Sequence, residues 1–303
     1  MKELGNFYAV ITENQMNTQI AQLIVNGIAV GSIIALAAVG LTLTYGILRL
    51  SNFAHGDFVT LGAYLTLLVN SFGVNIWLSM VIAAIGTVSA MLLSEKLLWS
   101  RMRSIRATST TFIIISIGLA LFLRNGIILI WGGSNKNYNL PVTSAMDILG
   151  VKVPQNQLLV LFLAVLAIVI LHYLLQNTKI GKAMRAVADD LDLARVSGIN
   201  VDRVVLWTWV IAGTLTSLGG SMYGLITAVR PNMGWFLILP LFASVILGGI
   251  GNPYGAIAAA FIIGIAQELS TPLLGSQYKQ GVALLLMILV LLVRPKGLFR
   301  STI

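Results

Sequence analysis

The chain has 303 residues, of which 57% are hydrophobic and only 10% are charged, and its mean hydropathy is +0.92. Soluble domains carry roughly a quarter charged residues, so this composition indicates an integral membrane protein. The long runs are apolar on every face, which favours helical spans over a β-barrel with alternating residues. The absence of cysteine excludes disulfides, thiolate metal sites and cysteine nucleophiles, and two histidines are too few for a histidine-built metal site. We attribute the net charge of +9 to cytoplasmic loops rather than to nucleic-acid binding.

The uncharged runs predict the membrane spans. Residues 14–48 hold no charge and lack the features of a signal peptide, so we expect a retained first span near 20–45. The run 58–94 is too long for one helix and is broken by NSFGVN (70–75), which predicts a short span near 53–70 and a full one near 75–95. Further spans are expected near 107–131, 157–175 and 204–229, and a polar loop separates the first two of these. The run 231–267 is divided by GGIGNPYG (248–255) into two more spans, and the last span is expected near 277–293.

Nine spans place the two termini on opposite sides of the membrane. Most basic residues then share one side, which includes 96–106, 179–203 and the C-terminal end, and the positive-inside rule makes that side cytoplasmic. If the short second segment is re-entrant, the N-terminus lies inside and the count falls to eight. We predict an all-α, polytopic helical membrane protein with about 8–9 transmembrane helices. Residues 1–303 would then form a single transmembrane domain.

The motifs of catalysis are missing from this sequence. No G-x-x-x-x-G-K-[ST] phosphate loop occurs, and GGIGNPYG lies between apolar helices without a lysine, so we interpret it as a tight turn. No HExxH, GxSxG or paired intramembrane carboxylates are present, which disfavours a membrane-embedded enzyme. The chain therefore lacks an ATPase site of its own.

Polar groups at membrane depth are expensive, so they are candidates for a pathway or a gate. These groups are Asn52, His55, Asp57, Arg124 and Glu268. For Asp57, capping of a helix start is an equally good interpretation. For Arg124 and Glu268, the alternative is snorkelling toward the lipid headgroups.

Glycine pairs at GxxxG spacing predict close helix packing, although glycine is common in membrane helices in general. The pairs are Gly27/Gly31, Gly220/Gly224 and Gly251/Gly255. Tyr45-Gly46 in the first half and Tyr223-Gly224 in the second hint at a duplicated unit.

The longest charged stretch is GKAMRAVADDLDLARVSGINVDRV (181–204). Apolar residues recur there at helical spacing over 183–199, which predicts a short amphipathic cytoplasmic helix. Arg185 is spaced to pair with Asp189, and Asp192 with Arg195, while Gly198 suits a helix C-terminus. We interpret this helix as a docking element for another protein, and the alternative is a solvated loop that only connects spans.

Several stretches resemble the LivH-type permeases, which are membrane subunits of ABC importers for branched-chain amino acids. These stretches are YGILRLSNFAHGDFVTLGAYL (45–65), RAVADDLDLARVSGIN (185–200), FASVILGGIGNPYGAIAAAFIIGIAQE (242–268) and RPKGLF (294–299). The second of them resembles the family's cytoplasmic coupling loop, here at about 176–203. The resemblance implies that an ATPase acts on this loop, on the residues Arg185, Ala188, Asp189, Asp190, Asp192, Ala194, Arg195, Gly198 and Ile199.

The resemblance also implies the partners. It implies a second, LivM-like permease, two cytoplasmic LivG/LivF-like ATPase subunits and a periplasmic amino-acid-binding protein, assembled in the lipid of the bacterial inner membrane. ATP would be used by the partner subunits, no cofactor would be bound by this chain, and transport would proceed by alternating access. Two alternatives stay open, namely an ABC permease for urea or short-chain amides and a self-sufficient secondary carrier.

Overall fold

The computed structural model describes residues 2–140, 145–148, 150–294 and 297–299. Within these residues the chain is almost entirely helical, with one small two-stranded sheet. Seven of the described helices are long and apolar enough to cross a membrane, and a shorter apolar helix covers Met233–Gly248. The prediction of a polytopic helical membrane protein is therefore confirmed.

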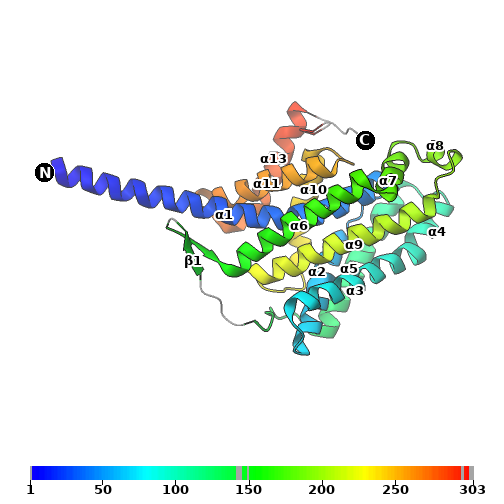
Figure 1. Ribbon diagram of the computed structural model, residues 1–303, viewed down its shortest axis with the longest axis horizontal. Coiled ribbons are helices and arrows are strands. Elements are labelled where there is room, and N and C mark those ends of the chain that lie inside the picture. The colour runs from blue at the N-terminus through cyan, green and yellow to red at the C-terminus, as the bar shows by residue number, and fades with distance from the viewer. Residues whose placement is uncertain (1, 141–144, 149, 295–296, 300–303) are drawn as a thin grey trace.

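A helix occupies each of the nine predicted spans within the described residues. In chain order the helices are α1 (Lys2–Leu48), α2 (His55–Ser71), α3 (Ile76–Ser94), a π-helical turn (Glu95–Trp99), α4 (Ser100–Ser104), α5 (Ser109–Trp131), α6 (Gln155–Asn177), α7 (Lys179–Asp189), α8 (Leu191–Val196), α9 (Val201–Ile226), α10 (Met233–Gly248), α11 (Pro253–Leu269), α12 (Thr271–Leu274), a 3₁₀ turn (Ser276–Tyr278) and α13 (Lys279–Val293). α1 begins well before the predicted span because no proline interrupts it, and its first turns project beyond the bundle (Figure 1).

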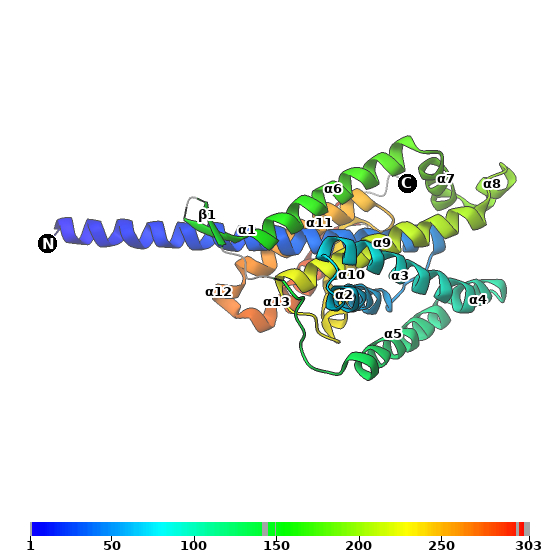
Figure 2. The same ribbon diagram turned by 60° about the horizontal axis from the view of Figure 1, so that its bottom comes forward.

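The centre of the bundle is formed by α1 and α9. In each of these helices 67% of the most apolar 18-residue stretch is buried, compared with 17% in α5 and 22% in α6. α11 packs along α1, while α2 and α3 pack against α9. Figure 2 shows α4, α7 and α8 at one end of the bundle and β1 at the other. The basic segments 96–106 and 179–203, which were predicted to share the cytoplasmic side, therefore lie at the same end.

The polar loop after α5 contains a β-hairpin that the sequence did not predict. β1 (Ala145–Ile148) pairs antiparallel with β2 (Val151–Pro154). The hairpin is fixed to α1, since Gln22 Oε1 accepts from the Lys152 amide at 2.9 Å and Gln22 Nε2 donates to the Lys152 carbonyl at 3.1 Å. A four-residue strand held by a contact so distant in sequence leaves only a weak local pattern.

Two units of the chain have the same order of elements, a helix, an irregular segment and a second helix, and they run in opposite directions. In the first, α1 ends, residues 49–54 are irregular and α2 begins; in the second, α9 ends, residues 227–232 are irregular and α10 begins. The sequences YGILRLSNFAHGDF (45–58) and YGLITAVRPNMGWF (223–236) align without a gap across these breaks. The Tyr-Gly pairs noted in the sequence thus belong to an inverted repeat.

The two units meet at Gly56 and Gly234, which occupy equivalent places in the repeat. A side chain on Gly56 would overlap the Gly234 carbonyl group, and a side chain on Gly234 would overlap the Gly56 carbonyl group. The Gly234 amide also donates to Thr60 Oγ1 at 2.9 Å. α2 and α10 therefore begin side by side inside the bundle and lead away in opposite directions, as discontinuous helices do in transporters with inverted repeats.

Candidate coupling segment and transport site

The predicted cytoplasmic helix is two helices, α7 and α8, which we call the coupling segment. The break falls at Asp190, whose Oδ1 accepts from the amides of Asp192 and Leu193, both at 2.9 Å. Aspartate is a strong N-cap because its carboxylate satisfies amides that have no partner within the helix. The prediction of one continuous helix was wrong for this reason.

α7 is anchored to the bundle on two sides. Its buried residues are Gly181, Met184 and Val187. Arg185 donates to the Leu175 carbonyl and to Gln176 Oε1, both near the end of α6. Arg49, directly after α1, donates to the Ala188 carbonyl at 3.3 Å. Arg185 therefore contacts α6, and the predicted pair with Asp189 is absent from the ion pairs of the described residues.

α8 faces outward at the end of the bundle. Ala194 is buried, but Leu193 is 62% exposed and Val196 is 81% exposed. Asp189, Asp192 and Arg195 are exposed too, and the predicted pair of Asp192 with Arg195 is likewise absent from the described ion pairs. Gly198 ends α8 with a φ of +82°, and the Ile199 amide closes the turn on the Ala194 carbonyl at 3.0 Å. α8 therefore presents a surface on which large apolar side chains are exposed amid charged ones.

A bidentate ion pair joins α5 to the start of α2. Arg124 Nε and Nη2 donate to the two carboxylate oxygens of Asp57, each at 3.1 Å. The guanidinium carbon also lies 4.8 Å from the ring centre of Trp235 on α10. The Asp57 side chain is 2% exposed and that of Arg124 is 16% exposed. Arg124 is thus paired rather than snorkelling, and Asp57 has a partner beyond its own helix.

This ion pair lies deep in the bundle. His55, two residues before Asp57, contacts the Ala37 carbonyl at 2.9 Å and Thr216 Oγ1 at 3.1 Å. Ala37 lies roughly 16 Å inside the end of α1, at a rise of 1.5 Å per residue. Arg124 lies roughly 22 Å along α5 from its start by the same rule. α5 continues for roughly 10 Å beyond Arg124, so both charges lie within a hydrocarbon layer about 30 Å thick.

The start of α2 is polar and incompletely hydrogen-bonded. Asn52 Oδ1 accepts from the Ala54 amide at 3.1 Å. Among the described residues, Asn52 Nδ2, His55 Nδ1 and Tyr64 Oη are buried without a hydrogen-bond partner. Such groups are rare in a rigid core, so they favour an element that finds other partners in a second conformation or binds water.

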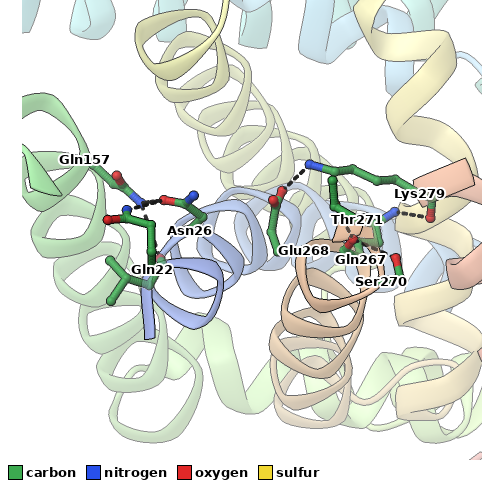
Figure 3. A network of polar contacts seen from close by, with 9 residues as sticks. Gln22, Asn26, Gln157, Gln267, Glu268, Ser270, Thr271 and Lys279 are labelled. Carbon is green, nitrogen blue, oxygen red and sulfur yellow. Dashed lines mark hydrogen bonds and ion pairs between the residues drawn. The ribbon is translucent and has the colours of Figure 1, made fainter. Parts of the chain in front are cut away.

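Glu268 lies elsewhere, at the end of the bundle opposite the coupling segment. Its carboxylate accepts from Lys279 Nζ at 2.6 Å, and Gln267 Nε2 donates to the Lys279 carbonyl at 3.0 Å (Figure 3). These contacts hold α11 against the start of α13. Glu268 therefore forms a clamp between helices near the membrane surface and is not part of the deep ion pair.

The glycine pairs lie at close contacts between elements. Gly27 and Gly31 face the backbone of α11 around Gly264 and Phe261. Gly220 lies against Val59, Gly224 against Tyr138 and Val229, and Gly255 against Gly248. Gly251 is the exception, because it lies in the turn before α11 at a φ of +86° and a Cβ there would be 3.9 Å from its nearest neighbour, Gly46.

Two cavities open at opposite ends of the bundle. One of about 90 Å³ lies beneath the coupling segment, where Thr42, Gln176 and Arg185 contribute polar groups to a mostly apolar lining. The other, of about 360 Å³, lies at the far end, and its lining includes Asn70, Asn75, Asn139 and Asn156.

Trp235 and Arg49 were missed by the sequence reasoning. Trp235 occupies the place in the second repeat that Asp57 occupies in the first, so the aligned repeats contain a signal for it. The sequence contains no local signal for the contact of Arg49 with Ala188, because this contact depends on how α7 folds back.

Comparison with known proteins places this geometry in a family. Residues 23–291 match the family described as "Branched-chain amino acid transport system / permease component". The chain is 32% identical over 297 residues to the high-affinity branched-chain amino acid transport system permease protein LivH of Salmonella typhimurium, covering 90% of this chain and 93% of that protein. It is 25% identical over 289 residues to the permease protein LivM of the same organism, covering 87% and 67% of the two chains.

A solved structure has the same fold. PsaBC from Streptococcus pneumoniae in complex with Fab superposes with a TM-score of 0.54 at 13% identity, covering 94% of this chain and 97% of that chain. The fold, and the family match over nearly all the spans, show that this chain belongs to the family of permease components of branched-chain amino acid transport systems.

Proposed function

We propose that this chain is the permease subunit of an ABC importer that moves branched-chain or other hydrophobic amino acids across the bacterial inner membrane. The observation that carries this proposal is the likeness, over 90% of the chain, to a permease named for that transport. The chain contributes the path, and its partners contribute ATP hydrolysis and substrate capture.

The surfaces of the chain support three kinds of partner. The likeness to both LivH and LivM supports pairing with a second, related permease. The exposed apolar residues of α8 provide a docking surface for a cytoplasmic ATPase, and two such subunits would serve the two permeases. The asparagine-lined cavity at the far end suits delivery of substrate by a periplasmic binding protein.

The coupling segment is connected to the deep polar site by a short route. Arg49 holds the Ala188 carbonyl of α7, and residues 49–54 lead directly from Arg49 to the start of α2. A displacement of α7 by an ATPase would therefore pull on the break that precedes His55 and Asp57. A difference of a few kcal/mol in ATPase contacts between two states is enough to shift such an equilibrium.

Reconstitution tests this function. Vesicles that contain only this chain are expected to take up no leucine, whereas vesicles with the assembled importer, its binding protein and ATP are expected to accumulate leucine. Leucine uptake by the chain alone, driven by a proton gradient, would show a self-sufficient carrier. Uptake of urea instead of leucine by the assembled importer would assign the substrate to the other class.

The coupling role has a test of its own. Replacement of Asp189 and Arg195 together by alanine is expected to leave the protein in the membrane and to abolish ATP hydrolysis stimulated by the binding protein, because both side chains are exposed on the docking side. ATP hydrolysis is measured on the purified complex. Hydrolysis equal to that of the unmodified complex would remove these two residues from the docking surface.

A further inference from the structure

The Asp57–Arg124 pair is the deepest charge pair among the described residues. The two other ion pairs, Arg103–Glu95 and Lys279–Glu268, lie toward the two ends of the bundle. Placing two charges in the membrane interior is unfavourable, and apolar residues would join α2 to α5 at lower cost. A function that needs charge at this depth accounts for the pair.

The ion pair is partly exposed at the surface of this chain. Arg124 keeps 16% of its side chain exposed, and the Trp235 ring that it contacts belongs to a residue that is 50% exposed. The next residue on α5, Asn125, is also exposed at this depth. Exposed polar groups in mid-membrane face a partner or a water-filled path in preference to lipid.

The ion pair also lies where the two inverted repeats meet. Asp57 and Trp235 are equivalent positions of the inverted repeat, and Arg124 contacts both of them. Two helices begin beside this point, and the positive ends of their dipoles favour an anionic group there. Discontinuous helices of inverted repeats carry substrate sites at this place in other transporters.

An apolar strip leads away from the pair along α10. Trp235, Leu239 and Phe242 follow one another at helical spacing, so they share a face. Leu239 is 37% exposed, and the Phe242 ring lies 4.8 Å from that of Phe53. The site therefore combines a positive group, a negative group and an adjoining apolar surface.

We propose that Arg124 and Asp57 form a subsite that binds the zwitterionic head of the transported amino acid, with Trp235 receiving its side chain and Leu239 lying beside this site, one turn further along α10. This inference rests on the proposed function. The Arg124 guanidinium would take the substrate carboxylate in a bidentate contact, and the Asp57 carboxylate would take the ammonium group. Binding exchanges one ion pair for two, so no bare charge is left in the membrane. The internal pair competes with the substrate, which keeps binding weak enough for release.

The absence of cysteine in this chain allows a direct test. A single Leu239→Cys reporter is placed in the assembled complex without its binding protein, and its rate of modification by a small charged thiol reagent is measured. The ligands are L-leucine, leucinamide, which lacks the carboxylate, and isocaproate, which lacks the amine. A Phe122→Cys reporter is the control, since Phe122 is 74% exposed and residues two apart on a helix do not share a face with Arg124.

In the otherwise unmodified complex, leucine alone is expected to slow labelling at position 239, and no ligand is expected to slow it at position 122. Asp57→Asn frees the guanidinium, so isocaproate should gain protection. Arg124→Gln frees the carboxylate, so leucinamide should gain protection. A purely structural ion pair produces neither gain, and both gains require a folded chain.

Two results would overturn the subsite while leaving the function in place. One is a complex that transports leucine but shows no protection by it at position 239. The other is an identical ligand preference in the unmodified, Asp57→Asn and Arg124→Gln complexes. Failure of the intact importer to transport any amino acid would instead overturn the proposed function.

Discussion

Single residues decide where the two repeats touch. Gly56 and Gly234 bring two backbones into contact in the middle of the bundle, and the amide of Gly234 still reaches Thr60. Only glycine allows this approach, because any Cβ would occupy the space of the opposite carbonyl group. The adjoining ion pair of Asp57 with Arg124 depends on the helix starts that this contact positions.

The replacement Gly234→Ala is therefore expected to destabilise the fold by about 1–3 kcal/mol through overpacking. Thermal unfolding of the purified protein in detergent measures this change. Gly126→Ala is the matched control, since a Cβ there meets nothing within 4 Å. The control should be neutral or stabilising by roughly 0.5–1 kcal/mol, as is usual for glycine in a helix. Equal unfolding temperatures for the Gly234 variant and the unmodified protein would contradict the close contact.

Among the elements, the coupling segment combines a fixed half with an exposed half. α7 is tied to α6 through Arg185 and to the end of α1 through Arg49, whereas α8 exposes Leu193 and Val196. This division fits the proposed coupling role, in which the exposed half would meet the ATPase and the anchored half would pass a displacement on to the bundle.

Replacement of Leu193 and Val196 by aspartate is expected to leave a folded permease that no longer co-purifies with its ATPase subunits, because the apolar contact surface is lost. Co-purification from membranes measures this association. Leu273→Asp is the control, since Leu273 is 87% exposed on α12, away from the coupling segment. Full retention of the ATPases by the α8 variant would place the docking surface elsewhere.

For the whole molecule, seven of the described helices are long and apolar enough to cross a membrane, while α2 and α10 are shorter and begin inside the bundle. Arg49 and the coupling segment lie together at one end, while the Glu268–Lys279 clamp lies at the other. This arrangement agrees with the positive-inside rule applied to the basic loops.

Thiol labelling tests this arrangement in intact cells. An impermeant reagent added outside is expected to label a Ser276→Cys variant and to spare a Ser197→Cys variant until the membrane is opened. Both serines are exposed and the chain has no other thiol. The opposite pattern would invert the orientation and separate the coupling segment from any cytoplasmic motor.

Much of this fold could be predicted from the sequence, because the membrane requires long apolar helices wherever charge is absent. The break at Asp190 could not, since an aspartate in an amphipathic pattern fits an exposed face as well as a cap. The pairing of Arg124 with Asp57 also escaped prediction, because it depends on how α5 packs against α2. Asp57 and Arg124 were singled out because charged residues at membrane depth are functional candidates. Their depth did not indicate that they form an ion pair with each other.

The inverted repeat has a consequence for biogenesis. The two halves enter the bilayer with opposite orientations, although the insertion machinery receives them as one chain. By the positive-inside rule, five basic residues between them are expected to stay on the cytoplasmic side and to orient the helices on both flanks: Lys179, Lys182, Arg185, Arg195 and Arg203. The stretch that we propose as the docking segment for the ATPase is thus also expected to act as a topogenic signal during synthesis.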